Sequence, residues 1–104
     1  MVYYTKHLNK YKLLRFMKDL IKKEVLRSLI LSRRWGGKHT EIRNLRKGIS
    51  IYILNTKSGK KDYKNAIKEL IKDNWLLAKK STGEIHVSLN PRKKAEIMKF
   101  SFED

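Results

Sequence analysis

Three histidines, His7, His39 and His86, are the side chains of this chain that could act as a base or a metal ligand near neutral pH. They lie far apart in the sequence, and none stands at ligand spacing from another His, Asp or Glu on one expected helix. The chain has no cysteine, which excludes disulfides, thiolate chemistry and zinc fingers. We therefore expect neither a metal site nor a cofactor.

The segment from Gly37 to Thr40 (Gly-Lys-His-Thr) faintly resembles a phosphate-binding loop. His39 stands where that loop requires Ser or Thr, however, and Ser32 stands where it requires its first glycine. No carboxylate pair and no serine–histidine pair has a spacing that indicates catalysis. We therefore expect that the protein is not an enzyme.

The charge of the chain points to a polyanionic partner instead. Lys and Arg number 26 against 10 for Asp and Glu, which gives a net charge of +16. Such a surplus repels itself unless an anion compensates it. Apolar residues are 40% of the 104 residues, enough for one folded domain, and no apolar run could span a bilayer. We expect one domain, 1–104, located in the cytoplasm and associated with the nucleoid.

The elements that must position these charges can be predicted from apolar spacing. Apolar residues recur every three or four positions over 13–31, which predicts a long basic amphipathic helix that ends before Gly36 and Gly37. Residues 1–12 form a basic N-terminal arm in which tyrosines alternate with cations. We expect a homodimer through 13–31, because this helix has more apolar surface than one small domain covers.

A second, short helix is expected over 40–48. Thr40 would be its N-cap and Gly48 its C′ residue. The alternation of Ile49, Ile51 and Ile53 fits either a short strand or an irregular packed segment over 49–54.

A third helix over 60–72 has the strongest pattern in the chain. Its apolar positions, from Tyr63 to Ile71, recur at helical spacing, and the opposite face is rich in lysine. It should end near Asp73 and Asn74, because Asn tolerates the left-handed conformation. In the alternative in which this lysine-rich face is only solvated, Glu69 and Asp73 would form i,i+4 pairs with its lysines.

A β-hairpin and a closing helix complete the predicted domain. Strands over 75–80 and 84–89 flank a turn at 81–83, with Ile85, Val87 and Leu89 facing the core. Asn90 and Pro91 then start a helix that packs back on the core. The folded core would span 13–99 and a tail would span 100–104. Trp35 and Trp75 are expected to close the core rather than to stack on bases.

This order of elements resembles a winged helix-turn-helix domain: an α+β, mainly α fold with a three-helix core, a β-hairpin wing and a C-terminal helix. The residues of 34–40, 45–48, 66–71, 82–83 and 88–93 are similar to the small stand-alone winged-helix proteins common in archaea. The longer connection between Gly48 and Lys60 departs from a tight helix-turn-helix.

The resemblance implies double-stranded DNA binding, with the third helix in the major groove and the wing on the backbone, in a transcriptional regulator or chromatin-associated protein. Independently, lysines suit phosphate, and Asn65 suits a bidentate contact with adenine unless it is merely an exposed polar position. Thr40, at the start of the second helix, could hold a phosphate together with its neighbours. The expected DNA-binding residues are Lys60, Lys61, Lys64, Asn65, Lys68, Lys79, Lys80, Thr82, Arg33, Arg34, Lys38, His39, Thr40 and Arg43.

Three other interpretations remain open from the sequence. The lysine-rich helix face could be solvated only, and Lys79 and Lys80 could serve to block strand aggregation. The same electrostatics would suit an RNA-binding module, although few aromatic residues are expected on the hairpin. A basic surface could also meet an acidic partner in a protein-interaction module.

Overall fold

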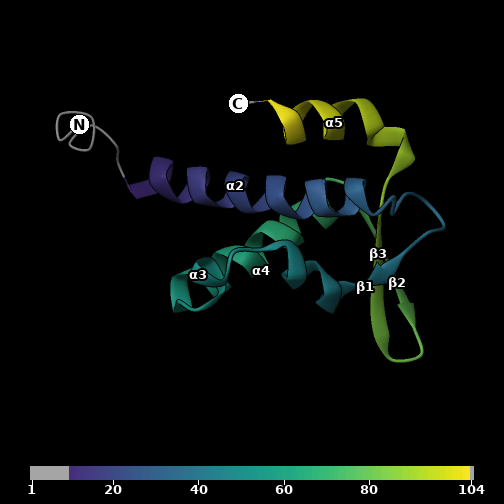
Figure 1. Cartoon of the computed structure of the whole chain (residues 1–104), viewed down its shortest axis with the longest axis horizontal. Coiled ribbons are helices and arrows are strands. Elements are labelled where there is room, and N and C mark those ends of the chain that lie inside the picture. Colours follow the sequence, from purple (N-terminus) through teal and green to yellow (C-terminus); the bar gives the residue numbers. More distant parts are fainter. Residues whose placement is uncertain (1–9, 104) are drawn as a thin grey trace.

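The computed structural model describes residues 10–103 and has an α+β fold that is mainly helical, with a small antiparallel sheet at one end (Figure 1). Helix α2 runs along the molecule, with α5 on one side of it and α4 on the other. The elements, in chain order, are α2 (Lys10–Leu31), β1 (Thr40–Glu41), η1 (Ile42–Gly48), α3 (Ile51–Leu54), α4 (Lys57–Lys72), β2 (Leu76–Ser81), β3 (Glu84–Leu89), η2 (Pro91–Lys93) and α5 (Lys94–Phe102).

Helix α2 confirms the predicted long helix and begins three residues earlier, so the end of the predicted arm at 10–12 is helical. The remainder of the arm, 1–9, lies outside the described residues. The C-terminal half of α2 buries Ile21, Val25, Leu26 and Leu29 in the core. The helix ends at Leu31, and Gly36 has a positive φ of 58°.

The segment after α2 is tied to the last strand. The backbone N–H of Leu89 donates to the carbonyl of Arg34 at 2.7 Å, and the N–H of Gly36 donates to the carbonyl of Leu89 at 2.9 Å. Trp35 is half-buried against the core cluster, as is Trp75, which confirms that both tryptophans close the core.

The predicted second helix over 40–48 is wrong at both ends. Thr40 is not an N-cap, because Thr40 and Glu41 form strand β1, which pairs with β3. A 3₁₀ helix, η1, follows and includes Gly48, so this glycine is not a C′ residue. Its Cα lies against α2, where an added Cβ would be 2.9 Å from the Cβ of Ser28.

The ambiguous segment over 49–54 is neither strand nor irregular but a single helical turn, α3. The hydroxyl of Ser50 accepts from the backbone N–H of Tyr52 at 3.3 Å and caps it. Apolar alternation was misleading here because Ile51 and Tyr52 are both exposed, so no pleated face is buried.

Helix α4 confirms the third predicted helix and begins three residues before it. The hydroxyl of Thr56 caps its N-terminus by accepting from the N–H of Gly59 at 2.9 Å. The helix ends as predicted, because Asn74 has a φ of 62° just after the C-cap. Its core face buries Tyr63, Ala66, Ile67 and Leu70.

The three-stranded sheet has the order β1-β3-β2, with both pairs antiparallel. The β2–β3 hairpin confirms the predicted one, and its two-residue turn, Thr82 (φ 48°) and Gly83 (φ 79°), has the dihedral signs of a type I′ turn. Val87 and Leu89 are fully buried, whereas Ile85 is 41% exposed. Ile85 therefore lies on the predicted face of the strand but at its open edge, outside the buried core.

Residues 100–102 belong to a helix rather than to the predicted tail at 100–104, and residue 104 lies outside the described residues. Asn90 caps η2 as predicted, because its side chain accepts from the N–H of Arg92 at 3.1 Å. Helix α5 then continues to Phe102, with Ser101 fully buried and the ring of Phe100 5.4 Å from that of Trp75. The folded core thus extends beyond residue 99. No helix within residues 10–103 is both long enough and apolar enough to cross a membrane.

Candidate nucleic-acid interface

The outer face of α4 is a row of exposed lysines. A helix turns by about 100° per residue, so positions 61, 64, 68 and 72 project away from the buried face at 59, 63, 66 and 70. None of the lysines in this row forms an ion pair with a carboxylate among the described residues. We call this row the α4 lysine face: Lys60, Lys61, Lys64, Lys68 and Lys72.

Glu69 does not neutralise this face, so the alternative that it pairs within its own helix is wrong. Its carboxylate is turned towards α2, where it lies 2.5 Å from the Nζ of Lys18 and 2.8 Å from the Nζ of Lys22. Hydrogen bonds from these two lysines lower the pKa of Glu69 to about 2. Asn65 is half-buried and lies one turn before Glu69, so it is turned partly towards α2 as well.

Lys79 and Lys80 point to opposite faces of the hairpin, because successive residues of a strand alternate. Lys79 pairs with His86 across the strands and Lys80 pairs with Ile85. Lys80 therefore lies on the sheet face that turns towards α4, and Lys79 on the other. Thr82 is exposed at the tip.

The other predicted DNA-binding residues do not form a phosphate site at a helix N-terminus. Thr40 is in a strand, and its Oγ1 accepts a hydrogen bond from the side chain of Asn44 at 3.0 Å. The side chain of Arg34 donates a hydrogen bond to the carbonyl of His39 at 3.4 Å. Arg33 and Lys38 are exposed. His39 lies near Lys79, since both line the same 300 Å³ hollow, whereas Arg43 lies beside Lys64 and Lys68, since all three line another hollow next to α4. The predicted residues thus fall on two surfaces.

The histidines His39 and His86 are brought together, although they are remote in sequence. Their Nδ1 atoms are 3.0 Å apart and their rings meet edge to face at 4.9 Å between centroids. Spacing along one helix, on which the sequence prediction rested, gives no sign of a contact between residues 47 positions apart. His7 lies outside the described residues.

Two glutamates on the same sheet face complete a group that could hold a cation. One ligand atom each from Glu41, Glu84 and His86 lies within 4.8 Å of the others. A hydrogen bond with the Glu84 side chain and the positive charge of Arg43 lower the pKa of Glu41. Arg43 forms an ion pair with Glu41 and lies 3.9 Å from Glu84, so a guanidinium already supplies the positive charge there.

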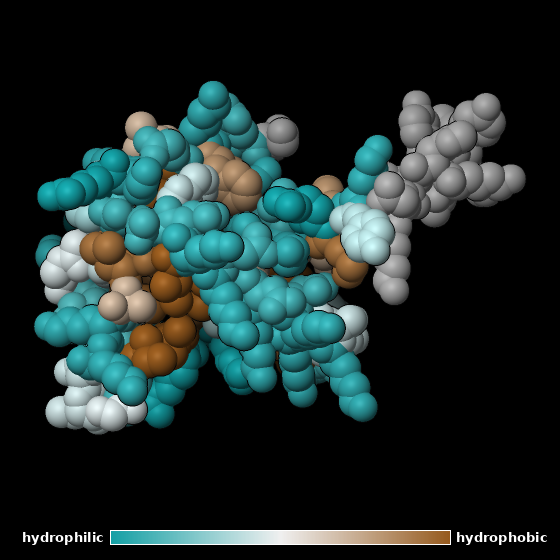
Figure 2. All heavy atoms as spheres, turned by 180° about the vertical axis from the view of Figure 1, so that it is seen from behind, coloured by the Kyte–Doolittle hydropathy of each residue, from teal (hydrophilic) through white to brown (hydrophobic). Residues whose placement is uncertain are grey.

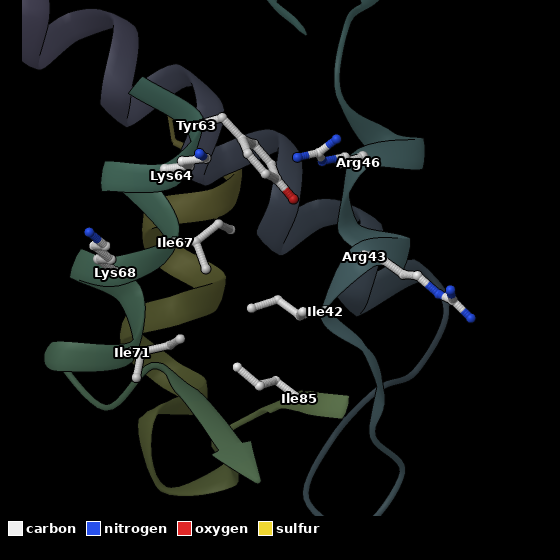
Figure 3. A pocket seen from close by; sticks show the side chains of 9 residues that line it. All are labelled: Ile42, Arg43, Arg46, Tyr63, Lys64, Ile67, Lys68, Ile71 and Ile85. Atoms are coloured by element: carbon white, nitrogen blue, oxygen red, sulfur yellow. The ribbon is translucent and has the colours of Figure 1, made fainter. Parts of the chain in front are cut away.

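Beside the α4 lysine face lies an apolar groove of about 460 Å³ between α4, η1 and the start of β3 (Figure 3). Four isoleucine side chains point into the space between these elements, while Arg43 and Lys68 extend away from it. Figure 2 shows a hydrophobic area among hydrophilic side chains on the side of the molecule where the sheet lies. We call this feature the isoleucine groove, lined by Ile42, Ile67, Ile71, Ile85, Tyr63, Arg43, Arg46, Lys64 and Lys68.

Arg46 is the residue of this region that sequence reasoning missed. Its guanidinium lies 5.9 Å from the centroid of the Tyr63 ring at one end of the groove. Burial raises the pKa of Tyr63, so its hydroxyl stays protonated. No sign of this role for Arg46 was present in the sequence, because no pattern in 40–48 indicates which side of η1 faces α4.

Comparison with known proteins identifies no relative: no family model, no curated protein and no solved structure matches the chain.

Proposed function

We propose that this protein binds double-stranded DNA without catalysing a reaction, as a winged helix-turn-helix protein that regulates transcription or organises chromatin. In this proposal α4 enters the major groove and the β2–β3 hairpin contacts the neighbouring backbone.

The observation that carries the proposal is the α4 lysine face. Five exposed lysines lie on one helix whose opposite side is buried, and no described carboxylate neutralises them. Glu69 is held by two lysines of α2, and neither Asp62 nor Asp73 forms an ion pair with the five exposed lysines. The face is therefore free to contact phosphates, in a chain whose net charge is +16.

The order of elements also supports the proposal. A long helix, a short helical segment, the basic helix α4, a hairpin and a closing helix follow one another as the resemblance requires. The turn of the hairpin projects from the end of the molecule, as Figure 1 shows, where a long ligand could reach both it and α4. DNA is favoured over RNA because the exposed hairpin residues include no aromatic side chain on which bases could stack.

The test is fluorescence anisotropy of the full chain with one labelled DNA duplex and one RNA duplex of the same sequence, each at several salt concentrations. We expect DNA to bind more tightly, with log K falling steeply as log salt rises. The double variant Lys61→Gln/Lys68→Gln should weaken DNA binding and make this slope less negative by about 0.9 per lysine.

The matched control removes the same charge elsewhere. Lys94 and Lys99 are exposed on α5, on the opposite side of α2 from α4. The variant Lys94→Gln/Lys99→Gln should therefore leave most of the slope intact. Equal losses in the two variants would show that only net charge matters, and tighter binding of RNA, or no binding at low salt, would refute the proposal.

A further inference from the structure

The isoleucine groove is a pre-formed apolar site that no described part of the chain covers. Ile67 is 6% exposed at its base, whereas Ile85 is 41% exposed at its edge, so the groove opens to solvent. Its volume of about 460 Å³ falls within the range of roughly 300–1,000 Å³ typical of small-molecule sites. The apolar walls favour an apolar ligand, since water in contact with them gains few hydrogen bonds.

One end of the groove presents two hydrogen-bond donors. The guanidinium of Arg46 forms no ion pair with any carboxylate of residues 10–103, unlike that of Arg43, which binds Glu41. The hydroxyl of Tyr63 has no hydrogen-bond partner among the described residues. Figure 3 shows the Arg46 guanidinium beside the Tyr63 ring at this end, with the Tyr63 hydroxyl pointing into the space between α4 and η1.

The charges around the groove select the head group of the ligand. No acidic residue lines it, and three of its four cationic residues, Arg46, Lys64 and Lys68, form no ion pair with a carboxylate of residues 10–103. A negative charge is therefore attracted and a positive one repelled. A carboxylate can accept hydrogen bonds from a guanidinium in two parallel contacts, and these are stronger than neutral ones.

We propose that the isoleucine groove binds a small anionic amphiphile, an apolar chain ending in a carboxylate. The chain lies over Ile42, Ile67 and Ile71, and the carboxylate accepts hydrogen bonds from Arg46 and Tyr63. This site goes beyond DNA binding and does not depend on it. Lys64 and Lys68 belong to both surfaces, so an occupied groove would reduce the charge available to DNA.

The experiment is an NMR titration of the isotope-labelled full chain, without nucleic acid, using sodium decanoate below the concentration at which it forms micelles. We expect saturable shift changes in the backbone amides of 42–46, 63–71 and 85. Decan-1-ol and decylammonium should bind at least about tenfold more weakly, because they lack the charge that Arg46 recognises. Equal affinity for decanoate and decan-1-ol, or shift changes at 11–20 instead, would overturn the proposal.

Paired variants locate the head group. Arg46→Gln and Lys47→Gln each remove one exposed charge from η1, but only Arg46 lines the groove. Arg46→Gln should weaken decanoate binding about tenfold or more, while Lys47→Gln should change it less than about twofold. Tyr63→Phe keeps the buried ring and should also weaken binding. Equal effects of Arg46→Gln and Lys47→Gln would refute the assignment.

A second arm separates a free amphiphile from a lipid surface, because both present apolar chains with anionic heads. Phosphatidylcholine vesicles containing phosphatidylglycerol are added in place of decanoate. The proposal expects monomeric decanoate to shift the groove amides in the absence of any vesicle. Binding to vesicles without binding of monomeric decanoate would assign the surface to a membrane and overturn the small-ligand site.

Discussion

At the scale of single residues, Glu69 shows how one carboxylate decides what a helix can bind. It accepts hydrogen bonds from Lys18 and Lys22, and Lys22 is only 8% exposed. Removing the carboxylate leaves the Lys22 ammonium desolvated without its partner. The contact therefore joins α2 to α4 and at the same time keeps a negative charge off the α4 lysine face.

We predict that Glu69→Gln lowers the free energy of unfolding at neutral pH by about 1–2 kcal/mol. Because folding lowers the pKa of Glu69 from 4.5 to about 2, the carboxylate stabilises the fold fully above pH 4.5 and loses this contribution as the pH falls to 2. Urea denaturation from neutral pH down to pH 2 should show the two proteins converging. Glu96→Gln, at an exposed pair with Lys93, is the control and should change stability by less than about 0.5 kcal/mol.

The hairpin turn contains a second residue whose conformation matters more than its contacts. Thr82 has a φ of 48°, a region that a β-branched side chain adopts only at a cost and that Asn tolerates. Thr82→Asn should therefore raise stability by about 1 kcal/mol and the melting temperature by a few degrees. Thr82→Val should not raise it. Thermal unfolding monitored by circular dichroism measures these changes. A lower melting temperature for Thr82→Asn than for the unaltered protein would show that the turn is not of type I′.

At the scale of elements, the junction between α3 and α4 fixes where the lysine face points. An added Cβ at Gly59 would lie 1.8 Å from the carbonyl oxygen of Ile53 and 2.7 Å from Thr56 Oγ1. Only glycine permits this approach, which is why one helical turn and a two-residue link suffice to orient α4.

Gly59→Ala is therefore expected to destabilise the protein by about 1–3 kcal/mol despite the higher helix propensity of alanine. Gly37→Ala is the matched control, because no atom lies within 4 Å of its added Cβ. It should be neutral within about 0.5 kcal/mol. Thermal denaturation of both variants measures the difference in stability. A melting temperature of Gly59→Ala equal to that of the unaltered protein would mean that α3 does not pack on α4 as described.

At the scale of the whole molecule, the N-terminal half of α2 extends past the core, as Figure 1 shows, and exposes a group of apolar side chains. Phe16 is 62% exposed, and Leu13 and Leu20 lie one turn away on the same side of the helix. We therefore expect the dimer surface, predicted over 13–31, to lie in the first half of the helix, because most apolar side chains of the second half are buried within one chain and only Leu31 is strongly exposed. Exposed apolar side chains grouped in this way favour association of two chains, because association removes them from water.

We expect the protein to sediment as a dimer at micromolar concentration, more completely at higher salt, because salt screens the repulsion between two chains of net charge +16. Leu13→Asp/Phe16→Asp should yield a monomer, whereas Tyr52→Asp, at an exposed aromatic residue of α3, should not. Analytical ultracentrifugation that shows only monomer for the unaltered chain would refute the dimer.

By itself the sequence determined the elements whose periodicity is long: α2, α4, the hairpin and the start of the closing helix. Several turns of helix or paired strand reveal their buried face through spacing alone. The end of α4 at Asn74 and the cap at Asn90 were also predictable, because they depend on the local preferences of single residues. The net charge and the lysine-rich side of α4 followed from composition and spacing in the same way.

Only the tertiary structure decided which side chains meet across distant segments. Thr40 entered a strand because β3 offers it a pairing partner, and His39 met His86 through that same register. Lys79 and Lys80 were separated by the pleat of the hairpin. Glu69 turned to α2, and Arg46 came to face Tyr63, through packing between helices that short-range spacing does not encode. These long-range contacts divide the predicted binding residues between two surfaces and create the isoleucine groove.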